Sequence, residues 1–255
     1  MSKSLDIKRY EIKYYIKDRL IPEIRQYIRP FSKFDPHIST KTKDSYTVRS
    51  IYYDTADLDY YFEKLDGLKI RKKLRIRGYN QNKSFVFLEI KRKYSNCIYK
   101  ERINLPVSEA KHIVEELEIP ANGKCMNSHF FRLISQKFLY NLKRKMLHPT
   151  LLVVYYREPH IGIFDNSVRL TIDSNVRSLF DPKMDDLFED KNLDEVINGK
   201  NILELKYNNF MPQWMKDMTS EFNLRNEAIS KYCMGIDTSC HEKLKLNLGS
   251  EHERI

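Results

Sequence analysis

Residues 69–77 read KIRKKLRIR, and this run limits the possible folds more than any other part of the chain. In a β-strand, residues two apart share a face. A strand over this run would therefore direct five basic side chains, at the odd-numbered positions, to one side. It would direct Ile70, Leu74 and Ile76 to the other side. We expect a strand with one basic face and one largely apolar face.

The alternation recurs in five further segments of the chain. They are residues 9–14, 87–91, 99–103, 168–173 and 203–207. One such strand alone is typical of a sheet with one face in water. Six segments that repeat Arg, Lys and Glu on one parity favour a closed barrel, in which the apolar face packs outward against helices and the charged face lines a tunnel. A tunnel of this kind would bind a polyanion.

The charge and the glycine content narrow the function further. A net charge of +10 in 255 residues, with 41% hydrophobic residues, indicates a folded protein with anionic partners such as nucleotides, polyphosphate, nucleic acid or an acidic membrane surface. Charge alone does not choose among them. The chain has only seven glycines and no Gly-rich phosphate loop. Phosphate binding would therefore depend on Arg and Lys side chains.

The cysteines and the apolar segments bear on the compartment. The four cysteines form no C-x-x-C pair, and no zinc spacing is present. The N-terminal residues lack the apolar core of a signal peptide, and the longest apolar run, residues 151–156, is too short to span a bilayer. We expect a soluble cytoplasmic protein with reduced thiols.

Helical patterns separate the predicted strands. We expect helices over roughly 16–31, 56–65, 108–117 with Ser108 as N-cap, 127–146 and 213–234. Residues 48–54 and 151–157 complete a set of about eight strands. Antiparallel strands with helices packed outside predict one α+β domain.

Several short motifs, taken in order, resemble one family. They are residues 50–55 (SIYYDT), Tyr60 with Lys64 and Gly67, the run from Arg71 to Tyr79, 87–91 (FLEIK), 100–102 (KER), 156–157, 168–173, 202–206 (ILELK) and 230–232 (SKY). In this order they resemble the VTC domain, the catalytic domain of vacuolar transporter chaperone polyphosphate polymerases. That domain is a member of the triphosphate tunnel metalloenzyme (CYTH-like) superfamily. The resemblance covers about residues 7–236.

The resemblance implies a fold, an activity and a cofactor. The fold is an eight-stranded antiparallel β-barrel tunnel with a charged lumen, helices packed outside and a C-terminal helix that closes the tunnel. Residues 1–236 would form this single domain, followed by a polar tail over 237–255. The activity is that of an ATP-polyphosphate phosphotransferase using Mn²⁺ or Mg²⁺, with ATP and inorganic polyphosphate as partners and no nucleic acid. A membrane-protein partner for export would hold the domain at the inner face of a membrane.

The resemblance also implies roles for individual residues. It places the catalytic phosphate-contacting side chains at Lys13, Arg75, Arg77, Lys91, Arg157 and Arg169. Further phosphate-binding residues are Lys100, Arg102, Lys206 and Lys231, the last on the closing helix. The metal-binding carboxylate is Glu204.

One departure from the superfamily pattern bears on the chemistry. The superfamily's hydrolases carry Glu-x-Glu-x-Lys on the first strand, whereas this chain has Arg9, Glu11 and Lys13. Fewer carboxylates favour one metal that bridges phosphates over two metals that position a water. The pattern therefore favours phosphoryl transfer. A tunnel hydrolase of triphosphate, nucleoside triphosphates or short polyphosphate stays an alternative, as does a non-catalytic polyphosphate-binding module.

Odd and even positions of a strand face opposite sides, and this parity separates the site candidates from other charged residues. Lys72 and Arg92 fall on the apolar parity, so we expect surface charges there. Lys69, Lys73 and Lys93 fall on the basic parity near strand ends, where they could guide a product chain. We expect Glu11, Glu89, Glu101 and Asp173 to pair with neighbouring bases rather than bind metal. Tyr52 and Tyr79 fit core or barrel-rim positions better than nucleobase stacking.

Overall fold

The computed structural model describes residues 9–36, 44–94, 97–124 and 128–240, with residues 97–98 described by their backbone only. The contacts divide the chain into two compact units. Unit 1 comprises Met1–Thr47, Tyr155–Val176 and Ile197–Ser230, and unit 2 comprises Val48–Val154, Arg177–Val196 and Lys231–Ile255. Strands β7 (His148–Gly162) and β8 (Arg169–Phe180) contribute residues to both units.

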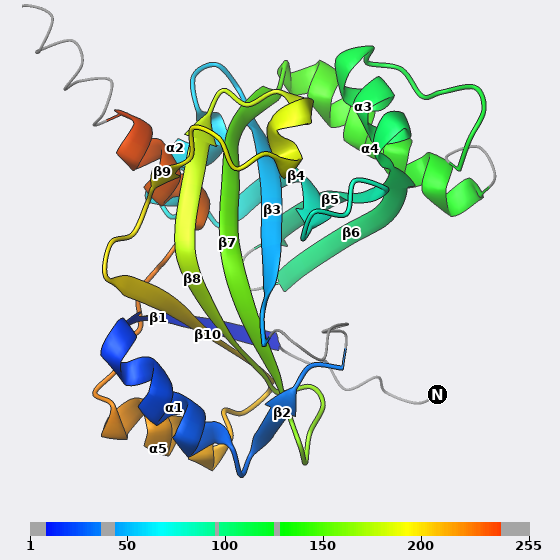
Figure 1. Cartoon of the computed structure of the whole chain (residues 1–255). Coiled ribbons are helices and arrows are strands. Elements are labelled where there is room, and N and C mark those ends of the chain that lie inside the picture. Colours follow the sequence, from blue (N-terminus) through cyan, green and yellow to red (C-terminus); the bar gives the residue numbers. More distant parts are fainter. Residues whose placement is uncertain (1–8, 37–43, 95–96, 125–127, 241–255) are drawn as a thin grey trace, which may run out of the picture. The chain divides into compact units, whose positions relative to one another are not determined.

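Unit 1 is built on an antiparallel sheet. Its strand order is β1-β10-β8-β7, and β2 pairs with the end of β7. The bounds are β1 Arg9–Lys17, β2 Ser32–Phe34 and β10 Lys200–Asn208. Its helices are the short η1 (Asp18–Leu20), α1 (Ile21–Ile28) and α5 (Gln213–Glu221), which lie together in Figure 1.

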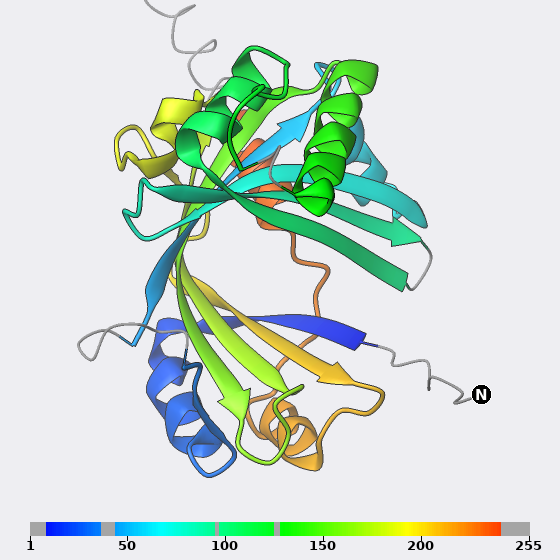
Figure 2. The ribbon, with the colours of Figure 1, turned by 90° about the vertical axis from the view of Figure 1, so that its right-hand side faces the viewer.

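Side-chain alternation determines which face of the unit 1 sheet is buried. Tyr14 and Ile16 of β1 pack in one cluster with Leu203 and Leu205 of β10. The buried residues of α1 and α5 belong to the same cluster: Ile24, Ile28, Met215 and Met218. Both helices therefore cover the apolar face of the sheet (Figure 2), and the face that carries Lys13 and Glu204 is left uncovered by them.

Unit 2 contains the longer part of the sheet. Its order is β8-β7-β3-β4-β5-β6, and β9 pairs with β8. The bounds are β3 Tyr46–Asp54, β4 Ile70–Tyr79, β5 Phe85–Tyr94, β6 Cys97–Pro106 and β9 Asp194–Glu195. The helices are α2 (Asp59–Leu65), α3 (Val107–Glu115), α4 (His129–Lys145), η2 (Met184–Phe188) and a last helix over residues 231–240.

The same parity rule holds in unit 2. Leu74 and Ile76 of β4 are fully buried in one cluster with Leu88 of β5 and Ile103 of β6. Phe138 of α4 belongs to this cluster, as do residues of α3. Figure 2 shows α3 and α4 on this side of the β4-β5-β6 strands. Lys73, Arg75 and Arg77, which alternate with Leu74 and Ile76 along β4, consequently project from the opposite face.

The predicted α+β class, with antiparallel strands and helices on the apolar face, is confirmed, and all eight predicted strands are present. The strand order begins at β1 and ends at β6. Within the described ranges, no ladder that would close this order into a barrel is found. No helix in that part of the chain is long and apolar enough to cross a bilayer.

The helix boundaries needed correction at three places. Residues 16–17 continue β1, because Ile16 extends the buried alternation of that strand, and α1 begins only at Ile21 with Pro22 in its first turn. The predicted helix over 213–234 is two helices, since α5 ends before Asn223, which has a φ of 49°. Helix α3 begins after Pro106, so Ser108 is not its N-cap. The last helix reaches residue 240, and residues 241–255 of the predicted tail lie outside the described residues.

Candidate functional site

Strands β4, β5 and β6 bring six predicted or candidate phosphate ligands onto one face of unit 2. They are Lys73, Arg75, Arg77, Lys91, Lys100 and Arg102, which we call the basic face. The strand register explains the grouping, because residues paired across antiparallel strands project to the same side. Arg75 is opposite Glu89, and Glu89 is opposite Arg102.

Glu89 lies at the centre of the basic face and is 1% exposed. Its carboxylate accepts a hydrogen bond of 2.6 Å from Nε of Arg75 and forms ion pairs with Lys100 at 2.8 Å and Arg102 at 3.2 Å. Burial alone would raise the pKa of Glu89, but the surrounding bases outweigh burial and lower it. The expectation that Glu89 pairs with bases is confirmed. This ionised carboxylate holds three bases in fixed positions.

Three lysines form a row across the same face. Lys73 is opposite Lys91, and Lys91 is opposite Lys100. Like charges directly opposite each other on a sheet repel. The pKa of Lys100 is lowered to about 8, chiefly by desolvation and also by the nearby arginines, and Glu89 offsets only part of this effect. The row thus produces a positive potential that a polyanion would relieve.

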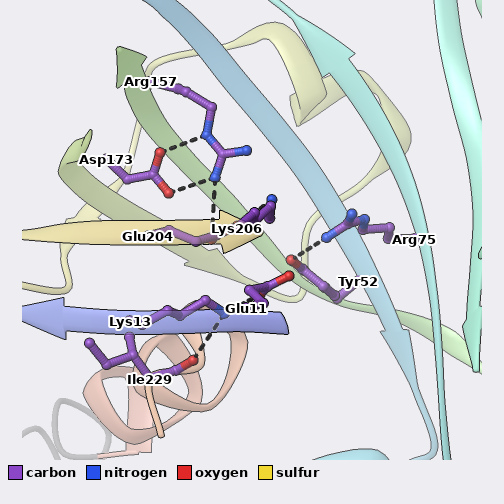
Figure 3. A network of polar contacts seen from close by, with 9 residues as sticks. All are labelled: Glu11, Lys13, Tyr52, Arg75, Arg157, Asp173, Glu204, Lys206 and Ile229. Atoms are coloured by element: carbon purple, nitrogen blue, oxygen red, sulfur yellow. Dashed lines mark hydrogen bonds and ion pairs between the residues drawn. The ribbon is translucent and has the colours of Figure 1, made fainter. Parts of the chain in front are cut away.

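The arginines of β4 differ in their contacts. Arg77 is buried, and its Nε donates to the hydroxyl of Ser50 at 3.0 Å. Arg75 is only 17% exposed, and its Nη1 donates to the Tyr52 hydroxyl at 3.0 Å. Burial would raise the pKa of Tyr52, but the neighbouring arginines and Lys73 lower it to about 7. The Tyr52–Arg75 contact, drawn in Figure 3, was not predicted from the sequence.

Two predicted phosphate ligands of unit 2, Arg102 of the basic face and Lys231 of the last helix, adjoin aromatic residues. The guanidinium of Arg102 lies 3.6 Å from the centroid of the Phe87 ring and donates to the Tyr79 hydroxyl at 3.1 Å. Lys231 is the first residue of the last helix and is half-buried. It directly precedes Tyr232, whose ring lies 5.2 Å from that of Tyr52.

The uncovered face of unit 1 carries the other candidates, and we call it the mixed face. It comprises Lys13, Arg157, Arg169 and Lys206 together with Glu11, Asp173 and Glu204. Figure 3 shows Arg157 beside Asp173, which accepts two hydrogen bonds of 2.7 Å from its guanidinium. Nη2 of Arg157 is also 3.8 Å from Glu204. Burial would lower the pKa of Arg157, but Asp173 outweighs it and raises the pKa, so Arg157 stays charged.

The remaining bases of the mixed face also have acidic neighbours. Nζ of Lys13 is 2.9 Å from Glu11 and donates to the carbonyl of Ile229 at 3.4 Å. Lys206 forms an ion pair with Glu204, two residues earlier on β10. Arg169, about half-exposed, is 3.8 Å from Asp35. Ion pairing of Glu11 and Asp173 was expected and is confirmed.

The arrangement of the carboxylates bears on whether the protein could bind a divalent cation. Among the described residues, no group of three or more His, Cys, Asp and Glu side chains converges. Mg²⁺ and similar cations commonly bind through one or two carboxylates, with substrate phosphates and water completing the shell. Glu204, buried on the mixed face beside Arg157 and Lys206, fits this mode of binding. An all-protein metal cage is not present in the described part of the chain.

The expectation that Glu101 pairs with neighbouring bases is confirmed. Glu101 lies on the helix-covered face, where it pairs with Arg92 and with Lys137 of α4, so it does not belong to either charged face. Glu101 lies two residues before Ile103 and four before Leu105, so strand alternation already indicated that it shares their helix-covered face. Lys72 and Arg92 lie on that face as predicted, but only Arg92 is an exposed surface charge. Lys72 is half-buried and donates to Asn141 of α4 at 2.6 Å.

Comparison with known proteins gives one family and two solved structures. The sequence profile of the VTC domain matches residues 8–240. A protein of Bacillus halodurans, provisionally described as an adenylate cyclase, is 13% identical with a TM-score of 0.49, covering 88% of this chain and 95% of that one. The PH1819 protein of Pyrococcus horikoshii is 18% identical with a TM-score of 0.45, covering 90% and 99%. No curated protein matches significantly.

Proposed function

We propose that this chain, which belongs to the VTC domain family, is a polyphosphate polymerase. The observation that carries the proposal is the basic face, where six Arg and Lys side chains share one strand face with the buried carboxylate of Glu89, which pairs with Arg75, Lys100 and Arg102. In the proposed reaction the bond between the β- and γ-phosphates of ATP breaks and ADP leaves. A new phosphoanhydride bond forms between the γ-phosphate and the end of a polyphosphate chain, which grows by one unit.

The arrangement suits phosphoryl transfer, because this reaction mainly requires in-line positioning and neutralisation of charge. Rigid strands supply the positioning, and Glu89 fixes Arg75 so that its remaining donors have a defined direction. We assign contacts with the reacting phosphates to Lys13, Arg75, Arg77, Lys91, Arg157 and Arg169. We assign binding of the rest of the phosphate chain to Lys100, Arg102, Lys206 and Lys231.

Closure of the strands into an eight-stranded tunnel with the last helix at its mouth, as a single domain over residues 1–236, is part of the proposal. Family membership supports it. The packing of α1 and α5 in unit 1, and of α3 and α4 in unit 2, on the apolar face of each sheet also supports it, and in unit 2 the last helix contacts the charged side through Tyr232. A tunnel would exclude bulk water from the reacting phosphates, which strengthens their interactions with Arg and Lys.

Glu204 would hold Mn²⁺ or Mg²⁺ together with phosphate oxygens of the substrate. The ion, when bound, would supply additional positive charge at the phosphates. Glu11 and Asp173 each have a basic partner within 3 Å. Glu204 is itself paired with Lys206 and lies near Arg157, so its choice rests on its place in the ILELK motif that resembles the family, and a single metal-binding carboxylate favours transfer to a phosphate over activation of water.

The test is to incubate the purified protein with ATP and Mn²⁺ and to measure long-chain polyphosphate, ADP and orthophosphate separately. Formation of long chains with matching ADP supports the proposal. Release of orthophosphate without chains would assign a tunnel hydrolase instead. Polyphosphate binding with neither product would assign a non-catalytic binding module.

A further inference from the structure

Two of the sequence motifs, SIYYDT at residues 50–55 and SKY at residues 230–232, meet in unit 2 although they are far apart in the chain. The hydroxyl of Tyr232 donates to Oδ2 of Asp54 at 2.5 Å. Neither Asp54 nor Tyr232 has a role in the proposed function so far. Both side chains are buried, with exposed fractions of 0% and 3%, so this contact is made away from water.

Asp54 organises the chain where β3 turns into α2. Its Oδ1 accepts hydrogen bonds from the backbone N–H groups of Thr55 at 2.8 Å and Tyr60 at 2.9 Å. Its Oδ2 accepts one from the N–H of Tyr61 at 3.1 Å in addition to the Tyr232 hydroxyl. Because the backbone donors hold the carboxylate in place, Asp54 is a rigid acceptor for the side chain from the last helix.

Tyr232 also contacts the basic face directly. Its ring lies 5.2 Å from the ring of Tyr52, and the ammonium of Lys73 lies 5.5 Å from the Tyr232 ring centroid. Tyr52 in turn accepts the hydrogen bond from Arg75. Burial, followed by the nearby Asp54 carboxylate, raises the pKa of Tyr232, so its hydroxyl stays protonated and remains a donor.

The last helix has other contacts within unit 2 that do not involve the basic face. Gly235 packs so closely that a Cβ there would lie 2.6 Å from Leu151. The hydroxyl of Tyr61 donates to Asp237 at 2.5 Å, six residues beyond Lys231. The helix is therefore attached at two hydrogen-bonded points, one next to Lys231 and one further along.

We propose that Tyr232, held by Asp54, is a positioning residue that sets both Lys231 and the Tyr52–Arg75 contact. This inference rests on the proposed function and deepens it. In this inference the last helix positions phosphate-binding residues and does not only pack against the sheet.

The contacts of Tyr232 connect Lys231 with Arg75. Lys231 adjoins Tyr232 in the chain, so fixing the Tyr232 ring fixes the backbone from which Lys231 projects. The same ring packs on Tyr52 and limits the positions open to its hydroxyl, which meets Arg75. Small displacements of groups that contact a reacting phosphate reduce the rate strongly. Loss of the Tyr232 hydroxyl should therefore reduce turnover even in a folded protein.

The decisive comparison is Tyr232→Phe against Tyr61→Phe. Each variant removes one hydroxyl that donates to a carboxylate and joins the last helix to α2 or its preceding turn. For Tyr232→Phe we expect kcat for polyphosphate synthesis to fall about tenfold or more while KM for ATP changes less than about threefold. For Tyr61→Phe we expect both constants to stay within about twofold of the wild type.

Thermal unfolding of both variants separates positioning from stability. Equal losses of kcat in the two variants, or a lower unfolding temperature of Tyr232→Phe with unchanged kcat, would overturn the inference. Asp54→Asn should reduce kcat in the same direction as Tyr232→Phe. If Asp54→Asn does not fold, Tyr232→Phe alone decides the result.

Failure of the proposed function gives a different result from failure of this inference. If the wild type makes no polyphosphate, the proposed function fails, and binding of fluorescent polyphosphate without metal becomes the measurement. Tyr232→Phe should then bind about threefold or more weakly, and Tyr61→Phe should bind like the wild type. Equal binding by all three proteins would overturn the positioning role.

Discussion

The basic face of unit 2 and the mixed face of unit 1 are built by the same strand alternation, but their charge balance differs. On the basic face, six Arg and Lys side chains share the strand face with the carboxylate of Glu89, which pairs with three of them, Arg75, Lys100 and Arg102. On the mixed face, each base has an acid within 4 Å. These pairs are Lys13 with Glu11, Arg157 with Asp173, Arg169 with Asp35 and Lys206 with Glu204.

Alternation alone therefore does not determine what a charged strand face does. An excess of positive charge, held in place by one buried carboxylate, is suited to binding a polyanion. A balanced face gains less from binding an anion, because its bases are already neutralised, but it supplies a carboxylate for a cation. We therefore expect removal of a base from the basic face to weaken polyanion binding, and removal of the Glu204 carboxylate from the mixed face to lower turnover.

Glu204→Gln should give the largest effect. We expect it to abolish turnover, because Glu204 is the proposed carboxylate for the metal, while polyphosphate binding without metal is largely retained. An activity assay paired with a metal-free binding titration tests this. Glu101→Gln, on the helix-covered face, is the control and should stay active. Full activity of Glu204→Gln would remove Glu204 from the site.

Arg75→Ala and Arg77→Ala should give the next largest effect, this time on binding. A desolvated hydrogen bond to a charged group contributes about 1.5 to 3 kcal/mol, so each variant should bind triphosphate about 10- to 150-fold more weakly. Lys72→Ala, on the opposite parity of the same strand, should change the affinity by less than about twofold. Calorimetric titration with tripolyphosphate measures all three, and equal effects would contradict the assignment of the faces.

The pH dependence of polyphosphate binding should be moderate and should arise on the basic face. Tyr52, with a pKa of about 7, becomes negative as the pH rises, and Lys100, with a pKa of about 8, loses its positive charge. Both changes weaken anion binding, so affinity should fall from about pH 6 to about pH 9. Binding titrations of Tyr52→Phe should lose the part of this fall near neutral pH. An unchanged profile in that variant would exclude Tyr52 as its source.

Neutralising Lys69, Lys73 and Lys93 together should give the smallest effect on nucleotide affinity. These lysines lie near the strand ends on the basic parity, where long-range attraction would retain a product chain. We expect shorter polyphosphate with little change in KM for ATP, as measured by gel electrophoresis and initial rates. A fall in ATP affinity with unchanged chain length would place them at the nucleotide site instead.

Sequence reasoning predicted the strands and the face of each charged residue well, and it was less successful at helix ends. The period of two is a local property of the extended backbone, so Lys72 and Arg75 could be assigned to opposite faces without knowledge of their neighbours. The break between α5 and the last helix depends on Asn223 adopting a positive φ, which propensity does not specify. Side-chain contacts within the site, such as that of Tyr52 with Arg75, could not be predicted, because they depend on how β3 pairs with β4.

The residue pattern was enough to predict which side chains share a strand face and that a strongly basic face would be present. It also indicated, through short motifs in a fixed order, the VTC domain family. Only the tertiary structure decided that Glu89 holds Arg75, Lys100 and Arg102 together, and that Asp54 receives the hydroxyl of Tyr232 from 178 residues away. The physical reason is that parity follows from the geometry of one strand, whereas charge balance and hydrogen-bond partners depend on strand register and on packing between distant segments.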